Sequence, residues 1–160
     1  LTVLKRYEEA LAAYEQAIQI NPHSATFRYN KALVLGKLEH YVESLESCEE
    51  SLRLNPGYAS AHNARGLALE ELKRFQEALA AYERAIQLDP NLFNVYYNKG
   101  NVLYRLKRYQ EALAVFDEAI RRDPENAYLW QSKGDTLKRL RWSEEAREAY
   151  ERARQLGYHG

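Results

Sequence analysis

The chain has 160 residues, and its 23 lysines and arginines balance 23 aspartates and glutamates, so the net charge is zero. This balance gives no sign of a nucleic-acid or membrane partner, and no stretch approaches the roughly 20 apolar residues that span a bilayer. The single cysteine, Cys48, excludes an internal disulfide framework and a cysteine-rich metal site. We therefore expect a cytoplasmic protein. The chain opens on Leu1 and contains no methionine, which we interpret as a piece of a longer protein.

The four prolines are the main organising signal. Each follows Asn or Asp, and successive prolines lie 34 residues apart. Proline has no backbone N–H and disfavours helix in the preceding residue, so each dipeptide stops a helix. Four stops at one period indicate a repeated unit. The prolines are Pro22, Pro56, Pro90 and Pro124.

Each unit also breaks once internally, for example at Lys107-Arg108-Tyr109. Apolar residues between the breaks recur at spacings of three and four, which is typical of helices. We therefore predict two helices per unit, helix A and helix B, and one helix before the first proline. Residues 1–4 are interpreted as the remnant of an earlier helix A. The predicted helices are 5–20, 25–38, 41–54, 59–72, 75–88, 93–106, 109–122, 127–140 and 143–156.

Small residues recur where the two helices of a unit should cross. Glycine in mid-helix costs about 1 kcal/mol relative to alanine, so close approach of another helix must offset it. Large residues on helix B alternate with the small ones, which predicts interlocked packing. The helix A column is Ala32, Gly66, Gly100 and Gly134. The helix B column, large except at Cys48, is Tyr14, Cys48, Tyr82, Phe116 and Tyr150.

These columns and the terminal Asp/Asn-Pro resemble the tetratricopeptide repeat, and Asn98-Lys99-Gly100 resembles prokaryotic arrays of that family. The resemblance implies an all-α fold, an α-solenoid of antiparallel helix pairs wound as a right-handed superhelix. It covers the whole chain as a single array. The units would be a half repeat at 1–24 and full repeats at 25–58, 59–92, 93–126 and 127–160.

Several positions depart from the family pattern. Arg28 and His62 stand where the family often has an aromatic residue, and a basic residue replaces a family leucine at four positions. The repeat at 25–58 is the most divergent, so we expect it to be the most loosely packed. The basic column is Lys31, Arg65, Lys99 and Lys133.

The two ends differ from the middle. Arg147 and Arg154 replace aliphatic residues that face the next repeat in earlier units, which predicts a polar end near residue 156. Tyr7 and Tyr14 are expected to form an exposed apolar edge. A homodimer through that edge is one possible partner arrangement.

No constellation of catalytic or metal-binding residues stands out. The four histidines are not paired at metal-ligand spacing, and there is no phosphate-binding glycine loop or nucleophile motif. We expect no cofactor, no metal and no enzymatic activity. Cys48 occupies a packing column and is interpreted as a small core residue.

The resemblance implies a concave groove lined by one face of each helix A. On α-helical spacing, Asn94, Asn98, Asn101 and Arg105 share a face, and asparagine can both donate to and accept from a peptide backbone. An acidic ligand segment would suit the basic residues of the C-terminal half. A chaperone-tail clamp is disfavoured because Tyr97 and Ser132 replace a lysine and an asparagine of that pattern. The candidate peptide-binding residues are Tyr29, Asn30, Asn63, Asn94, Tyr97, Asn98, Asn101, Tyr104, Arg105, Gln131, Asp135, Lys138 and Arg139; Thr26, Leu33, Lys37, Ala64, Leu67, Glu71, Tyr128 and Ser132 belong to the same predicted face.

The sequence therefore predicts a non-catalytic scaffold that binds a protein or peptide in its groove. Two alternatives stay open. The chain could be the recruiting arm of a larger enzyme, or it could be a self-association module.

Overall fold

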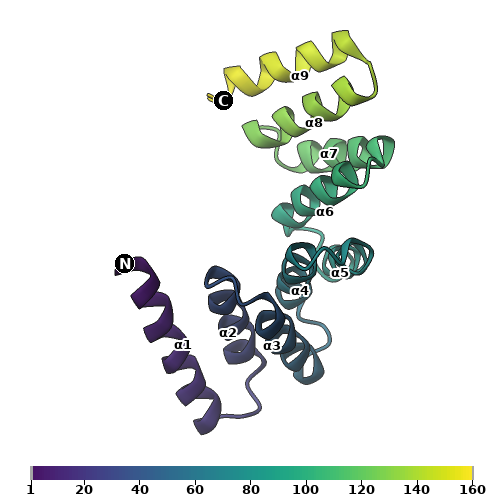
Figure 1. Ribbon diagram of the computed structural model, residues 1–160. Coiled ribbons are helices and arrows are strands. Elements are labelled where there is room, and N and C mark those ends of the chain that lie inside the picture. Colours follow the sequence, from purple (N-terminus) through teal and green to yellow (C-terminus); the bar gives the residue numbers. More distant parts are fainter. Residues whose placement is uncertain (1, 160) are drawn as a thin grey trace. The chain divides into compact units, whose positions relative to one another are not determined.

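In the computed structural model, residues 2–159 are described, and they form nine α-helices and no strand (Figure 1). They fall into two compact units, Leu1–Asp89 with the first five helices and Pro90–Gly160 with the other four. The predicted all-α solenoid architecture is confirmed. The helices are α1 Thr2–Ile20, α2 Ala25–Lys37, α3 Tyr41–Leu54, α4 Ala59–Glu71, α5 Phe75–Leu88, α6 Phe93–Arg105, α7 Tyr109–Arg122, α8 Ala127–Arg139 and α9 Ser143–Gln155.

The observed bounds follow the prediction closely, with one correction at the start. Residues 2–4 do not form the remnant of a separate helix, because α1 runs unbroken from Thr2. No proline or glycine interrupts the segment around Lys5, and its leucine, lysine and arginine residues favour helix. Leu1 lies outside the described residues.

The turn inside each unit explains why every helix A ends one residue earlier than predicted. The residue after the C-cap leucine has a positive φ, between 61° and 66°. The next N–H bonds back to a carbonyl five residues earlier, as from His40 N to Leu35 O at 2.9 Å. This is the Schellman arrangement, which satisfies the last carbonyls of a helix. The residues with positive φ are Glu39, Lys73, Lys107 and Arg141.

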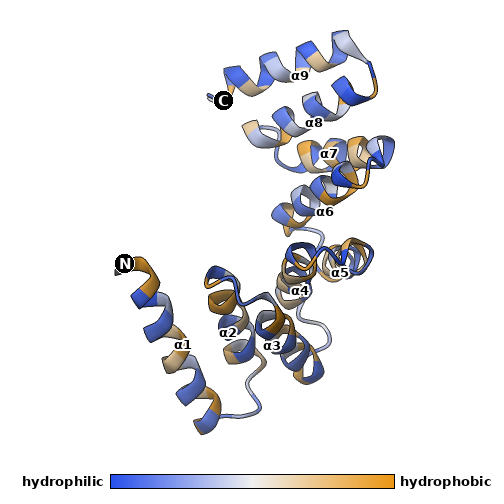
Figure 2. Ribbon diagram, in the orientation of Figure 1, coloured by the Kyte–Doolittle hydropathy of each residue, from blue (hydrophilic) through white to orange (hydrophobic). Residues whose placement is uncertain are grey.

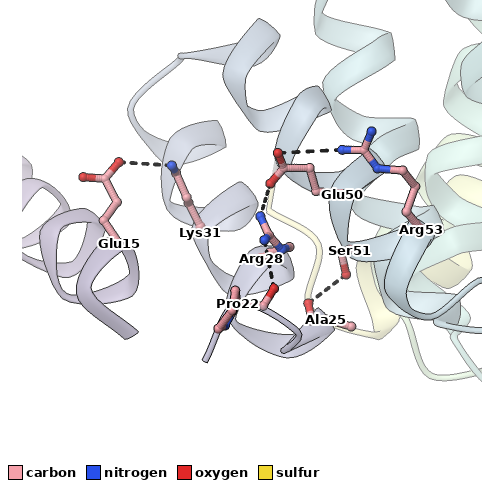
Figure 3. Close-up of polar contacts among 8 residues, drawn as sticks. All are labelled: Glu15, Pro22, Ala25, Arg28, Lys31, Glu50, Ser51 and Arg53. Atoms are coloured by element: carbon pink, nitrogen blue, oxygen red, sulfur yellow. Dashed lines mark hydrogen bonds and ion pairs between the residues drawn. The ribbon is translucent and has the colours of Figure 1, made fainter. Parts of the chain in front are cut away.

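At each proline turn, one side chain bonds back to the proline carbonyl. These side chains stand at equivalent positions of the repeat, although the residue type differs from one repeat to the next. Arg28 Nη2 donates to the carbonyl of Pro22 at 2.9 Å (Figure 3). His62 Nε2 lies 3.0 Å from the carbonyl of Pro56, and Tyr96 and Trp130 make the same contact six residues after Pro90 and Pro124. All four side chains carry a hydrogen-bond donor at the end. Arg28 and His62 therefore make the same contact as Tyr96 and Trp130.

The predicted close crossing of the paired helices is present in both units. In the first unit, a Cβ built on Gly66 would lie 2.4 Å from the ring of Tyr82. In the second, a Cβ on Gly100 would lie 2.4 Å from Phe116, and one on Gly134 would lie 2.5 Å from Tyr150. These distances leave no room for a methyl group, which accounts for glycine at the three positions.

In the α2–α3 pair, different residues stand at the same crossing. They are Ala32 and Cys48, and both are fully buried. Ser44 Oγ donates to the carbonyl of Ala32 at 2.8 Å. Ser51 Oγ donates to the carbonyl of Ala25, also at 2.8 Å (Figure 3). That this repeat packs most loosely stays a prediction, while two serine hydrogen bonds join its two helices. Serine hydroxyls satisfy carbonyls there while the small side chains let the helices approach.

The basic column that replaces a family leucine joins consecutive repeats. Lys31 Nζ lies 3.0 Å from Glu15 (Figure 3), Arg65 lies 3.6 Å from Glu49, and Lys133 lies 2.7 Å from Asp117. Each pair connects a helix A to the helix B that precedes it, and each is partly shielded from solvent. The sequence shows these residues only as departures from a pattern.

The first and last helices carry the features noted in the sequence. On α9, which Figure 2 shows mainly in blue and white, Arg147 and Arg154 are exposed. On α1, Tyr7 and Tyr14 are half-buried rather than exposed, because α1 packs against α2. The large apolar side chains that are exposed on α1 include Val3 at 65%, Leu4 at 51% and Ile20 at 86%.

Candidate functional site

The second unit contains a groove that gathers seven of the predicted residues. It encloses about 230 Å³ between α6, α7 and α8, and we call it the unit 2 groove. Its α6 wall comes from positions i, i+4 and i+7, and its α8 wall from i, i+3, i+4 and i+7, so each wall is one helix face. Its residues are Tyr97, Asn101, Tyr104, Phe116, Tyr128, Gln131, Ser132, Asp135 and Tyr158.

Hydrogen bonds fix the polar side chains of the unit 2 groove. Asp135 accepts from the hydroxyl of Tyr150 at 2.9 Å. Burial, and then this bond, raises the pKa of Tyr150. Arg139 Nε donates to Tyr104 Oη at 3.0 Å, and its guanidinium lies 5.9 Å from the ring centroid. The groove therefore presents ordered tyrosines, a carboxylate and two amides, which suits hydrogen bonding to a peptide backbone.

The other predicted residues of this unit lie outside the groove. Asn94 and Arg105 are exposed on α6, and Asn98 is half-buried there. Lys138 borders a larger basic surface together with Arg147 and Arg154. Of the three asparagines predicted to share one face of α6, only Asn101 therefore lines the unit 2 groove.

The first unit contains a second concave site, between α2, α3 and α4, with a volume of about 250 Å³, which we call the unit 1 cleft. The predicted residues Leu33, Lys37, Ala64, Leu67 and Glu71 lie in it. Its remaining residues, which were not predicted as site residues, are Ala32, Gly36, Tyr41, Ser44 and Ala68.

Four predicted residues of the first unit are not in the cleft, and one of them, Thr26, is exposed on α2. Tyr29 packs on the buried cluster of Ala32, Cys48 and Ala64, and its ring centroid lies 4.9 Å from that of Tyr58. Asn30 and Asn63 are half-buried outside the cleft lining. Tyr29 thus has a packing role in this structure.

The thiol of Cys48 is poorly placed to act as a nucleophile. Cys48 is fully buried, and this burial raises the pKa of its thiol to about 12, so the thiolate that a nucleophile requires is scarce at neutral pH. Over residues 2–159 there is no group of three His, Cys, Asp or Glu side chains arranged to hold a metal ion. Within the same range, no helix has both the length and the apolar content needed to cross a membrane.

Family models match most of the chain. One described as "TPR repeat" matches residues 3–39 and 71–107, and others described as "Tetratricopeptide repeat" match residues 25–58, 93–126 and 115–148. No curated protein sequence gives a significant match.

Solved structures resemble the chain over nearly its full length. MamA superposes with a TM-score of 0.88 at 21% identity, covering 94% of this chain and 88% of MamA. MamA from Desulfovibrio magneticus RS-1, residues 41 to the end, gives a TM-score of 0.86 at 20% identity, with coverages of 97% and 91%. YrrB, described as a TPR protein with an unusual peptide-binding site, gives 0.80 at 26% identity, with coverages of 98% and 81%.

Proposed function

The chain belongs to the tetratricopeptide repeat family, and from this premise we propose that it is a non-catalytic scaffold that binds a protein or peptide in the concave sites that its A helices line. The observation that carries the proposal is the unit 2 groove, where Tyr97, Asn101 and Tyr104 face Gln131 and Asp135 across one concavity. The peptide-binding site named for YrrB, at 26% identity, supports the same class of ligand.

The groove is suited to an extended segment with acidic residues. Lys138 and Arg139 are exposed at the end of α8, and Arg105 is exposed at the end of α6. Exposed charges of one sign favour association with the opposite sign and make it salt-dependent. Reversing the charge at Arg105 and Lys138 should therefore weaken binding of an acidic peptide and reduce its salt dependence. Unchanged affinity and salt dependence in this variant would rule out the acidic ligand.

A displayed library of random dodecapeptides, selected on the wild-type protein, tests the proposal. Enriched peptides should lose about tenfold or more in affinity for a Tyr97→Ala/Asn101→Ala variant, because ordered aromatic and amide contacts dominate such interfaces. Gln110→Ala, at an exposed position of α7, is the matched control and should bind normally. Circular dichroism confirms that each variant is folded. The scaffold proposal would be refuted if no peptide were enriched. It would also be refuted if the enriched peptides bound the concave-site variants as tightly as the wild type.

A second candidate is a homodimer formed through α1. Val3 and Leu4 are adjacent apolar side chains that are more than half exposed, and such patches mark association surfaces. Light scattering at several concentrations should show a mass increase that Val3→Glu/Leu4→Glu abolishes. A constant monomer mass for the wild type would exclude this candidate.

A further inference from the structure

The unit 1 cleft exists because one repeat lacks the large side chains that fill the same place in others. In the pair α4–α5, the ring of Tyr82 passes Gly66, and its hydroxyl donates to Glu70 at 3.0 Å. The residues 34 positions earlier are Cys48, Ala32 and Gly36. The α2–α3 pair therefore has neither the ring nor the long side chain that receives its hydroxyl.

The floor of the cleft is closed and its polar atoms are satisfied. Ala32, Ser44, Ala64 and Ala68 are all buried, and Ser44 Oγ donates to the Ala32 carbonyl at 2.8 Å. The cleft is open above Gly36, where a Cβ would meet only Ser44 Oγ at 3.7 Å within contact range. The space is thus a concavity over a packed floor.

The walls of the cleft are apolar and exposed to solvent. Leu33 on α2 and Leu67 on α4 each keep 40% of their surface exposed, although both lie beside buried alanines. The volume of about 250 Å³ exceeds the roughly 150 Å³ in which an engineered protein cavity holds a benzene molecule. One leucine or phenylalanine side chain from outside would fit there and cover both leucines.

The rim carries two opposite charges, Lys37 on α2 and Glu71 on α4, and both are exposed. Among the ion pairs of residues 2–159, neither charge has a partner. The nearby Lys31 and Arg65, in contrast, are paired with Glu15 and Glu49. The apolar floor thus lies between two opposite charges that have no ion-pair partner among the described residues. Such a site favours a ligand whose charges are arranged in the complementary order.

We propose that the unit 1 cleft binds one leucine or phenylalanine side chain of a partner peptide, with an acidic residue on the Lys37 side and a basic residue on the Glu71 side. This proposal rests on the proposed scaffold function and names the anchor that the first unit recognises. Burial of such a side chain corresponds to about a 10- to 100-fold gain in affinity.

Gly36→Leu is the decisive variant. Leucine is a better helix former than glycine by up to about 1 kcal/mol, and the space at Gly36 accepts a side chain, so the variant should fold at least as stably as the wild type. Its side chain would occupy the cleft. Ala32→Gly/Cys48→Tyr fills the cleft by the other route, because it recreates the Gly66–Tyr82 pair. Val42→Leu, at an exposed position of α3 outside the cleft, is the control.

The probe is the random dodecapeptide library displayed on phage and selected on the wild-type protein. We expect enriched peptides with a central leucine or phenylalanine between opposite charges. Their affinity should fall 10- to 100-fold for both cleft-filling variants and stay unchanged for Val42→Leu. The exchange variant Lys37→Glu/Glu71→Lys should prefer peptides in which the two charges are swapped.

The outcomes separate the two proposals. If enriched peptides bind Gly36→Leu as tightly as wild type but lose affinity for Tyr97→Ala/Asn101→Ala, the scaffold function stands and the cleft proposal is wrong. If no peptide is enriched, both proposals fail. A concentration-dependent doubling of mass that Gly36→Leu abolishes would show that a second copy of the chain fills the cleft, which would also overturn the peptide proposal.

Discussion

The indole Nε1–H of Trp130 donates a hydrogen bond of 2.9 Å to the carbonyl oxygen of Pro124, six residues earlier. The bond joins the first turn of α8 to the turn that stops α7. Arg28 and Tyr96 make the equivalent bond to Pro22 and Pro90 with different chemical groups. A donor at this position therefore fixes the path of the chain between repeats.

We expect Trp130→Phe to destabilise the protein more than Trp130→Tyr. Tyrosine can supply the donor, as Tyr96 does, whereas phenylalanine cannot. An intramolecular hydrogen bond contributes about 0.5 to 1.5 kcal/mol net, and the partly solvated site favours the lower half of that range. Chemical denaturation of the two variants measures the difference. Equal unfolding free energies for phenylalanine and tyrosine would show that the bond contributes nothing.

Glycine to alanine should have opposite signs at two positions. At Gly100, a Cβ would lie 2.4 Å from the ring of Phe116, so Gly100→Ala should cost about 1 to 3 kcal/mol despite better helix propensity. At Gly36, a Cβ has room, and Gly36→Ala should stabilise by up to about 1 kcal/mol. Unfolding free energies from urea titration test both. A stabilising Gly100→Ala would contradict the close crossing of α6 and α7.

The Gly100 site also offers a test of coupling. Combining Gly100→Ala with Phe116→Cys reproduces the pair Ala32 and Cys48 of the first unit. The double variant should lose less stability than the sum of the two single variants, with a coupling of about 0.5 to 3 kcal/mol. Additive losses would show that the pairing of sizes is unimportant.

The protein should lose stability in mild acid through His62. Its Nε2 faces the Pro56 carbonyl at 3.0 Å, while Nδ1 is buried without a hydrogen-bond partner among the described residues. Burial, and then the charges of Arg84 and Arg65, lower the pKa of His62 in the folded state against the rise from the Pro56 bond. Above the unfolded pKa of about 6.5 both states are neutral; below it the unfolded state binds the proton first, so stability falls.

His62→Tyr provides the comparison, since tyrosine keeps a donor but does not titrate in this range. Thermal or urea unfolding of both proteins between pH 7.5 and pH 5 should show curves that diverge below about pH 6.5, with the wild type losing more stability. Parallel curves across this range would exclude His62 as the source of the acid sensitivity.

Glycine should be better than lysine at the turn after α4. Lys73 has φ of 62°, in a region that costs a residue with a Cβ about 1 to 2 kcal/mol. Lys73→Gly should therefore stabilise the protein by about 0.5 to 1 kcal/mol after the added freedom of the unfolded chain is subtracted. Ala80→Gly, at an exposed position inside α5, should instead cost about 1 kcal/mol. Denaturation midpoints that move the same way in both variants would contradict this account.

The sequence was sufficient for the helices because prolines and spacing act locally. Every predicted helix from 25–38 onward begins at the observed residue. The shorter helix ends were missed because the positive φ falls on Glu39, Lys73, Lys107 and Arg141, none of which signals such a turn as glycine would.

The candidate site was predictable only in part. Periodicity placed Tyr97, Asn101, Tyr104, Gln131 and Asp135 on facing walls, but it could not show that Asn98 falls outside the groove. The unit 1 cleft depends on three small residues from two helices, Ala32, Gly36 and Cys48. None of the three residues indicates a cleft by itself, because the open space results only from their combination.

The ion pairs between repeats have a consequence for chain length. The unit 25–58 carries Lys31 on its first helix and Glu49 on its second, so it gives one charge to each neighbour. Removing this unit as a block would bring Arg65 opposite Glu15, again a basic residue facing an acidic one. Loss of this 34-residue unit would therefore leave a basic residue facing an acidic one at the new junction.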